Sequence, residues 1–207
     1  MAFLMPEILV TGSTGFVGKA VVHRLLAEDE SRKVAVAVRR NVQQWISRVV
    51  PRVTGDLEPR ADWSIALGGI VAVVHCAARV HVMEDKSGNP LEAFRRVNVQ
   101  GTLNLARQAA AAGVKRFVFV SSIKVNGEMT QLGVPFTVDD EPAPLDAYGI
   151  SKMEAEQGLR EIARQTDMEV VIIRPPLVYG PGVKANFAAM MRWLKLGVPS
   201  PLGAIHN

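Results

Sequence analysis

The chain has 207 residues, 48% of them hydrophobic, which is enough for one well-buried domain and the beginning of another. Its formal charge of +4 comes from 24 basic and 20 acidic residues scattered along the sequence, which favours an anionic small molecule over a nucleic acid as the partner. No uncharged run reaches the ~20 residues of a membrane helix, and the single cysteine, Cys76, excludes an intrachain disulfide framework, so we expect a cytoplasmic protein.

Apolar, β-branched runs alternate with helix-like segments along most of the chain. This alternation is typical of a doubly wound parallel α/β sheet, the Rossmann arrangement. The sequence predicts strands near residues 7–11, 33–38, 49–54, 72–76, 116–121 and 169–174. The predicted helices are residues 17–27, 91–112, 147–164 and, more briefly, 186–195. Between them, the Pro, Asp and Gly content of residues 127–144 predicts a long loop, and long loops in compact domains are often functional.

Three glycines separate the first predicted strand from the first predicted helix. Gly12 permits a tight turn, Gly15 lets the backbone approach a pyrophosphate, and Gly18 lets helix and strand pack closely. The free N–H groups at the start of the helix would then face the anion. An ordinary strand-to-helix turn is the alternative, but the flanking apolar strand and helix favour a dinucleotide cradle.

A second group of polar residues follows the fifth predicted strand. Ser121 and Ser122 end that strand, where ligands of open α/β sheets bind. Tyr148 and Lys152 are four residues apart, so they share one face of the predicted helix. An ammonium group beside a phenol lowers the pKa of the phenol, and a serine hydroxyl can hold the same substrate oxygen. Each residue alone has an ordinary reading, but together they predict a proton-transfer site for a carbonyl and its alcohol, with a nicotinamide exchanging the hydride.

The ordered motifs resemble those of the extended short-chain dehydrogenases/reductases, the nucleotide-sugar epimerase/dehydratase group. They are Thr11–Gly18, His75–Ala78, Asn98–Thr102, Ser121–Ser122, Tyr148–Lys152 and Arg174–Gly182. The resemblance implies a catalytic set of Ser122, Tyr148 and Lys152, with Ser121 as the fallback serine. It implies a cofactor site made of Gly12, Ser13, Thr14, Gly15, Phe16, Val17, Gly18, Arg39, Asp56, Leu57, Ala77, Ala78, Tyr148, Lys152 and Pro175. It also places His81, Ser121, Ser122, Asn126, Leu177 and Asn186 near a nucleotide-sugar substrate.

The resemblance implies two regions. Residues 1–175 would form the NAD(P)-binding Rossmann domain, and residues 176–207 would begin a smaller substrate-binding lobe. The chain stops without a packed strand or helix, so we expect a further segment in the full protein. Pairing of two subunits through long helices, as in many members of the family, stays open.

Within that group, the sequence is similar to bacterial reductases of UDP-4-keto-6-deoxy-N-acetylglucosamine, which serve surface polysaccharide synthesis. Asn126 and Leu177 stand where a tyrosine and an asparagine are usual in the epimerases. A dehydratase is disfavoured because Ile123 and Lys124 offer no acid pair beside the serine. The alternatives are a nucleotide-sugar 4-epimerase that keeps its NAD bound and a dinucleotide-sensing module without activity.

The preferred nicotinamide cofactor depends on the charge at the end of the second strand. Arg39 and Arg40 follow that strand, and no acid stands beside them. Because an arginine accommodates a ribose 2′-phosphate, the sequence predicts a preference for NADP(H), with NAD(H) as the alternative. Four dispersed histidines and one cysteine show no metal-ligand spacing, so we expect no metal.

Overall fold

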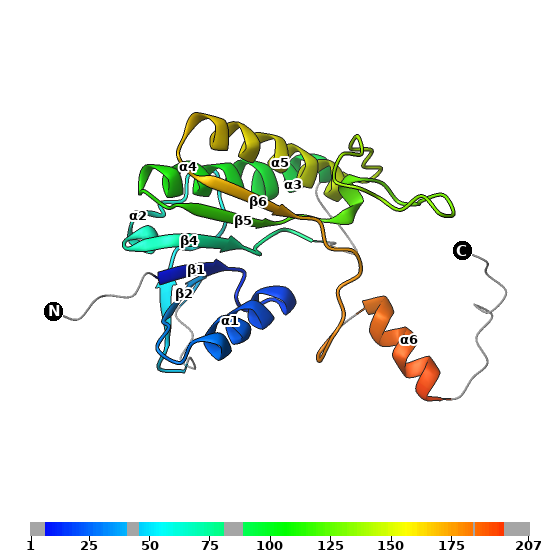
Figure 1. The fold of residues 1–207 in the computed structure, drawn as a ribbon, viewed down its shortest axis with the longest axis horizontal. Helices are drawn as coiled ribbons and strands as arrows, with labels where there is room; N and C mark the ends of the chain where they lie inside the picture. Colours follow the sequence, from blue (N-terminus) through cyan, green and yellow to red (C-terminus); the bar gives the residue numbers. More distant parts are fainter. Residues whose placement is uncertain (1–6, 41–45, 81–88, 184, 197–207) are drawn as a thin grey trace.

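The computed structural model describes residues 7–40, 46–80, 89–183 and 185–196. Its centre is a six-stranded, fully parallel sheet with the strand order β3-β2-β1-β4-β5-β6 (Figure 1). The strands are β1 (Glu7–Thr11), β2 (Val34–Val38), β3 (Val49–Val53), β4 (Ile70–His75), β5 (Arg116–Val120) and β6 (Glu169–Ile173). The order reverses between β1 and β4, which is where ligands of such sheets bind. The predicted doubly wound fold is confirmed.

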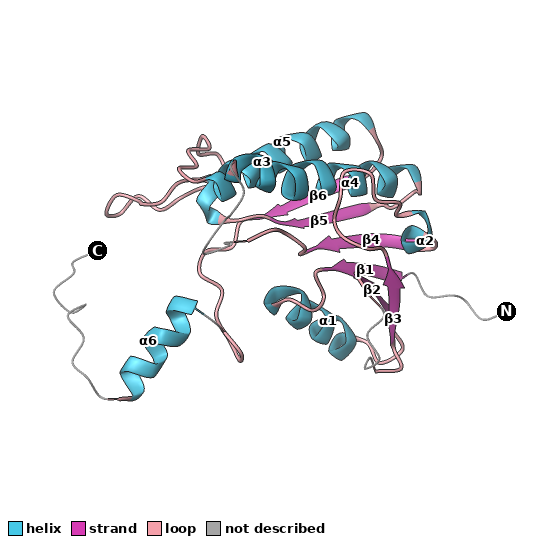
Figure 2. Ribbon diagram, turned by 180° about the vertical axis from the view of Figure 1, so that it is seen from behind, coloured by secondary structure: helices cyan, strands magenta, loops and turns pink. Residues whose placement is uncertain are grey.

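Helices lie on both faces of the sheet. One face carries α1 (Phe16–Glu28), which packs on β1 and β2. The other face carries a layer that Figure 2 shows clearly, and its members are α3 (Pro90–Phe94), the π-helical turn η1 (Arg95–Gly101), α4 (Thr102–Ala111) and α5 (Ala147–Gln165). The remaining elements are the one-turn α2 (Ser64–Leu67), the 3₁₀ turn η2 (Ile123–Val125) and α6 (Ala185–Lys195). No helix in these described segments is long and apolar enough to cross a membrane.

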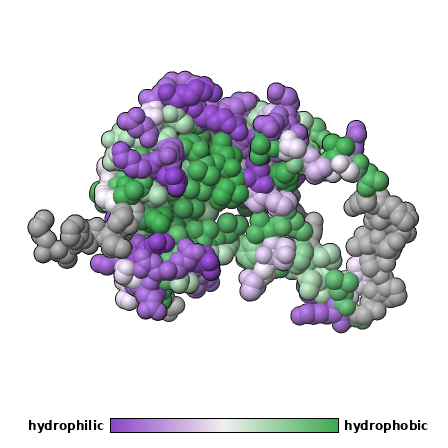
Figure 3. All heavy atoms as spheres, in the orientation of Figure 1, coloured by the Kyte–Doolittle hydropathy of each residue, from purple (hydrophilic) through white to green (hydrophobic). Residues whose placement is uncertain are grey.

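Two apolar cores hold these layers together. Between the sheet and the α4–α5 layer lie fully buried side chains such as Phe117, Phe119, Leu105 and Leu159. Val34, Val36 and Val38 of β2 lie under α1 and its other two residues face the first core, so the whole strand is buried, as its apolar run predicts. On the α1 face, Val171 and Ile173 of β6 remain 40% and 47% exposed, and Figure 3 shows apolar side chains gathered over the central strands. The described residues therefore cover only one of the two sheet faces completely.

The predicted helix over residues 91–112 is continuous but not regular. Its middle, η1, is a π-helical turn, which adds one residue per turn to the backbone spiral. Asn98 in this turn is 1% exposed and lies on the same buried helix face as Phe94 and Leu105. Hydrophobic periodicity did not predict this irregularity, because the apolar residues on both sides keep a helical spacing.

The turn from β1 into α1 brings two backbone segments unusually close. Gly12 has a φ of 66°, the left-handed conformation that glycine adopts without strain. A Cβ atom built on Gly18 would lie 2.2 Å from the carbonyl oxygen of Gly12, well inside contact distance. Only glycine at position 18 therefore lets α1 begin directly over the end of β1.

Replacing Gly18 by alanine should lower the free energy of unfolding by about 1–3 kcal/mol, since the added methyl group must push α1 off the strand. Gly68→Ala is the matched control, because its Cβ would meet its nearest neighbour at 3.7 Å. We expect a change of less than about 0.5 kcal/mol for the control. Urea unfolding of the three proteins measures both effects, and equal stabilities would contradict the close packing.

A second buried feature of the sheet is the imidazole of His75 at the end of β4. Its Nδ1 lies 2.7 Å from Thr11 Oγ1 and its Nε2 lies 2.9 Å from Thr102 Oγ1. Burial lowers the pKa of His75 to about 3, and the charge of Lys152 contributes in the same direction. The ring is thus held neutral while it links β1, β4 and α4.

This histidine should make the fold sensitive to mild acid. The unfolded chain protonates His75 near its ordinary pKa of about 6.5, whereas the folded chain does not, so stability falls as the pH drops below that value. At about pH 5 the loss should be about 2 kcal/mol. His75→Gln should be less stable at neutral pH but should lose less on acidification. Parallel losses in urea titrations of the two proteins would rule out this role.

Candidate functional site

A cleft of about 1080 Å³ opens at the carboxyl ends of the strands, between the β1–α1 turn and the segment after β4. Most of the residues predicted to bind a cofactor line it. These are Gly12, Thr14, Gly15, Phe16, Val17, Gly18, Arg39, Asp56, Leu57, Ala77 and Ala78. The sequence reasoning missed Trp63, Arg79 and Val97, which also line it. Arg79 directly follows Ala77 and Ala78, and this position in the sequence could have indicated that it lines the cleft.

The N-terminus of α1 forms one wall of this cleft. Gly15 is the N-cap residue, and neither a side-chain cap nor an acidic residue satisfies the first turn of the helix. A Cβ on Gly12 would lie 2.7 Å from the Ala77 nitrogen, so a side chain there would not fit beside the neighbouring segment. Ser13 is 1% exposed, and its hydroxyl has no hydrogen-bond partner among the described residues. Such a cradle of free donors fits the pyrophosphate of a dinucleotide.

Two arginines and an aspartate stand at the other end of the cleft. Arg39 and Arg40 line it directly after β2. The Arg39 Nη1 lies 3.6 Å from Asp56 Oδ1, and both side chains are mostly exposed. An exposed pair at this distance is weak, so the guanidinium can turn toward an anion without a large loss.

Lys152, the charged residue of the predicted catalytic set, is buried. Its ammonium donates a hydrogen bond to the Val120 carbonyl at 2.8 Å and lies 4.4 Å from the centre of the Phe119 ring. Burial lowers the pKa of Lys152 to about 8, whereas the charges of Cys76 and Glu156 act to raise it. Lys152 therefore carries a charge at neutral pH that a small change in its surroundings would alter.

Tyr148 lies one turn earlier on the same helix. The Lys152 ammonium is 5.9 Å from the centre of its ring, and the Phe94 ring packs edge-on against it at 6.1 Å. Burial raises the pKa of Tyr148, the carboxylate of Asp146 raises it further, and Lys124 opposes them. Burial and Asp146 thus outweigh Lys124, and the role of Lys152 in lowering this pKa stays a prediction.

The predicted catalytic serine, Ser122, lies on a turn that contacts both the exit of β6 and the start of α5. Ser122 is the N-cap of η2, and its Oγ accepts a hydrogen bond from the Lys124 nitrogen at 3.3 Å. The next residue, Ile123, donates its N–H to the Pro175 carbonyl at 3.1 Å, which ties the turn to the β6 exit. A Cβ on Gly149 would lie 3.0 Å from the Lys124 carbonyl, so the start of α5 presses on this same turn.

Lys124 also holds the start of α5, the helix that carries Tyr148 and Lys152. Its ammonium lies 2.5 Å from Asp146 Oδ2 and 3.0 Å from Glu128 Oε1. The other carboxylate oxygen of Asp146 caps α5 by accepting the Gly149 N–H at 2.6 Å. The Ser122 turn and the helix that carries Tyr148 and Lys152 are therefore joined into one piece.

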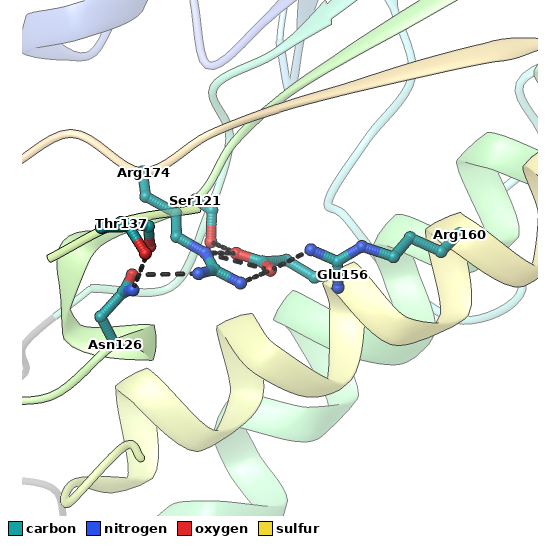
Figure 4. A network of polar contacts seen from close by, with 6 residues as sticks. All are labelled: Ser121, Asn126, Thr137, Glu156, Arg160 and Arg174. Carbon is teal, nitrogen blue, oxygen red and sulfur yellow. Dashed lines mark hydrogen bonds and ion pairs between the residues drawn. The ribbon is translucent and has the colours of Figure 1, made fainter. Parts of the chain in front are cut away.

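Two residues predicted to contact substrate are hydrogen-bonded inside the protein, and their contact with substrate stays a prediction. Ser121 donates to Glu156 at 2.6 Å, and Asn126 Oδ1 accepts from Arg174 at 3.0 Å (Figure 4). Sequence reasoning missed Glu156, although it follows Lys152 by one helical turn and so shares its face. Leu177 is 66% exposed beyond Pro175. Asn186 is the second residue of helix α6, and His81 lies outside the described residues.

The described residues contain no group of three or more histidine, cysteine, aspartate or glutamate side chains that could hold a metal ion. Cys76 lines the cleft, and burial raises the pKa of its thiol to about 11. A thiol with such a pKa is a poor nucleophile at neutral pH. Ser122, Tyr148, Lys152 and Pro175 are not among the residues that line the cleft, but Lys152 is close enough for its charge to act on Cys76, which does line it.

Several known proteins are similar to this chain in sequence or in fold. A protein of Vibrio cholerae named UDP-glucose 4-epimerase is 52% identical over 203 residues, covering 97% of this chain and 61% of its own length. A short-chain dehydrogenase/reductase superfamily protein of Agrobacterium tumefaciens, solved with bound NAD, is 37% identical with a TM-score of 0.67, covering 81% of this chain and 48% of that one. MoeE5, solved with UDP-glucuronic acid and NAD, is 30% identical with a TM-score of 0.76, covering 90% and 60%.

The chain thus spans 61% or less of the length of each of these proteins. The family described as NAD dependent epimerase/dehydratase matches residues 8–199, which is nearly the whole chain. The match includes the glycine-rich turn, the strand-end serines and the helix that carries Tyr148 and Lys152. This chain belongs to the NAD dependent epimerase/dehydratase family.

Proposed function

We propose that this chain is the cofactor-binding part of an enzyme that epimerises a nucleotide-linked hexose at C4 through a keto sugar. The observation that carries the proposal is the 52% identity to the Vibrio cholerae protein named UDP-glucose 4-epimerase, which extends over 97% of this chain. Because the chain spans 61% of that relative, the activity is proposed for the whole protein. We also propose a cytoplasmic location. The division at residue 175 and a homodimer stay predictions.

The side chains of Ser122, Tyr148 and Lys152 suit this chemistry. A nicotinamide cofactor bound in the cleft would supply the hydride acceptor and donor. Tyr148 Oη takes the proton of the sugar hydroxyl and later returns it. Ser122 Oγ donates a hydrogen bond to the same sugar oxygen and so holds it beside the phenol. The charged Lys152 stabilises the phenolate, which burial alone disfavours.

The same residues also serve a second candidate, the reduction of a 4-keto nucleotide sugar such as UDP-4-keto-6-deoxy-N-acetylglucosamine. The observation in its favour is the pair Arg39 and Arg40 in the wall of the cleft. A guanidinium group there suits the 2′-phosphate of NADP(H), which a reductase consumes in each turnover. An epimerase needs no fresh cofactor, so the two candidate enzymes differ in whether they consume reduced nicotinamide cofactor.

Tyr148→Phe should reduce the conversion of UDP-glucose to UDP-galactose by about 10²–10⁴-fold, because it removes the group that carries the proton. Affinity for NAD should stay within about twofold, since the ring and its packing remain. Product analysis and calorimetric titration measure the two quantities. Full turnover in the Tyr148→Phe variant would refute the role of the phenol.

The cofactor itself separates the two candidates. An epimerase should bind NADH at least as tightly as NADPH and leave the absorbance of reduced cofactor unchanged during turnover. In the reductase, NADPH should bind more tightly, and Arg39→Ala should weaken NADPH about 10–100-fold while NADH changes little, because only the former loses a charge-assisted hydrogen bond. Arg24→Ala, which removes an exposed ion pair with Glu28 on α1, is the control.

A further inference from the structure

A fully buried carboxylate lies behind the predicted catalytic residues. Glu156 on α5 is 0% exposed and accepts hydrogen bonds from Ser121 Oγ at 2.6 Å and from Arg174 Nη2 at 2.6 Å (Figure 4). Arg174 Nε adds a second bond at 2.9 Å, so the guanidinium holds the carboxylate with two of its nitrogens. Arg160, which is 43% exposed, closes the group at 3.0 Å from the solvent side.

The remaining nitrogen of Arg174 reaches in the opposite direction. Its Nη1 donates to Asn126 Oδ1 at 3.0 Å, and Asn126 Nδ2 donates to the Thr137 carbonyl at 3.1 Å. One guanidinium therefore joins α5 to the loop of residues 127–143. Arg174 also directly precedes Pro175, whose carbonyl holds the turn that starts at Ser122.

Stability alone does not explain such a pair. Buried ion pairs are often replaced by apolar side chains without loss of stability, because removing two charges from water costs about as much as their attraction returns. Here the pair connects the end of β5 and helix α5, which carry the predicted catalytic groups, to the exit of β6. The loop of residues 127–143, which follows the Ser122 turn, is held by the same arginine.

We propose that Glu156 and Arg174 are positioning residues for the proposed reaction. Glu156 supplies the negative charge that faces Lys152 one helical turn away, and Arg174 fixes the loop of residues 127–143 against the catalytic helix through Asn126. Neither residue touches the reacting atoms. The proposal rests on the proposed function in one respect: the charge of Lys152 matters because the proposed reaction uses it.

The groups around Lys152 determine what a change at Glu156 should do. Cys76 and His75 face it from the end of β4, the ring of Phe119 from β5, and Tyr148 and Glu156 from its own helix. Of these, Glu156 is the carboxylate. Burial acts to raise its pKa, but the hydrogen bonds from Arg174 and Ser121 outweigh burial and keep that pKa low. Glu156 is therefore ionised wherever Lys152 titrates.

Replacing Glu156 by glutamine should lower the pKa of Lys152 by about one pH unit or more, because the opposite charge is lost while Arg174 stays positive. The measurement is a ¹⁵N NMR titration of the Lys152 ammonium, which needs no turnover. Glu156→Asp should restore most of the wild-type titration, and Arg160→Gln should leave it nearly unchanged. An unchanged titration in folded E156Q would overturn the proposal.

Arg174→Lys tests whether Arg174 fixes the loop of residues 127–143. Because this substitution keeps the positive charge, it also provides a test if E156Q does not fold. A lysine can pair with Glu156 but cannot hold Asn126 as well. Amide hydrogen exchange of residues 127–143 should become about tenfold faster, with the Lys152 titration unchanged. Unchanged exchange would refute the coupling.

Kinetics of the active enzyme separate this inference from the proposed function. The alkaline limb of kcat should move to lower pH in E156Q, since Lys152 loses its proton earlier. In R174K the main change should be in KM. Absence of any epimerase or reductase activity would defeat the proposed function, while the titration and the exchange data would still decide the roles of Glu156 and Arg174.

Discussion

Helix α5 must lie flat against the ends of β5 and β6, and the candidate site depends on this contact. Three polar attachments fix it: Lys152 to the Val120 carbonyl, Glu156 to Ser121 and Arg174, and the cap Asp146 to Lys124. Between them, Gly149 lets the helix approach the Ser122 turn more closely than any other residue would. A phenol on the first turn of α5 thus has a defined place relative to the strand ends.

The charges that make these attachments are costly to bury, and this cost shapes the chemistry. The pKa of Lys152 falls to about 8 and that of Tyr148 rises, so burial disfavours the charged form of both groups. The two pKa values therefore lie further apart than the ordinary values of 10.5 and 10.0, so the Lys152 ammonium loses its proton before the Tyr148 phenol does.

Much of the fold was predictable because buried parallel strands are nearly continuous apolar runs. Predicted and observed strands agree within about two residues, as for the predicted 116–121 and the observed Arg116–Val120. The one-turn α2 was not predicted, since four residues carry no periodic signal. The glycine turn and the Tyr148–Lys152 spacing were visible because a local geometric requirement fixes each of them.

The missed features share a different cause. Glu156 and Arg174 are 18 residues apart, and each resembles an ordinary solvent-facing charge until the fold brings them together. The direction of the Tyr148 pKa also depends on burial, which spacing does not reveal. Sequence patterns report which residues share a face, whereas the charge state of a buried group depends on everything packed around it.

The side chain of Asn98 joins the cleft to helix α5. Asn98 accepts the N–H of Arg79 at 2.8 Å and donates to the Arg79 carbonyl and to Ser151 Oγ, both at 3.0 Å. Ser151 in turn donates to the Tyr148 carbonyl at 2.7 Å. The backbone that lines the cleft after β4 is thus connected to the backbone of the predicted proton carrier. Asn98 lies four residues after Phe94 and seven before Leu105, so it shares their buried helix face, and its amide there reaches both Arg79 and Ser151.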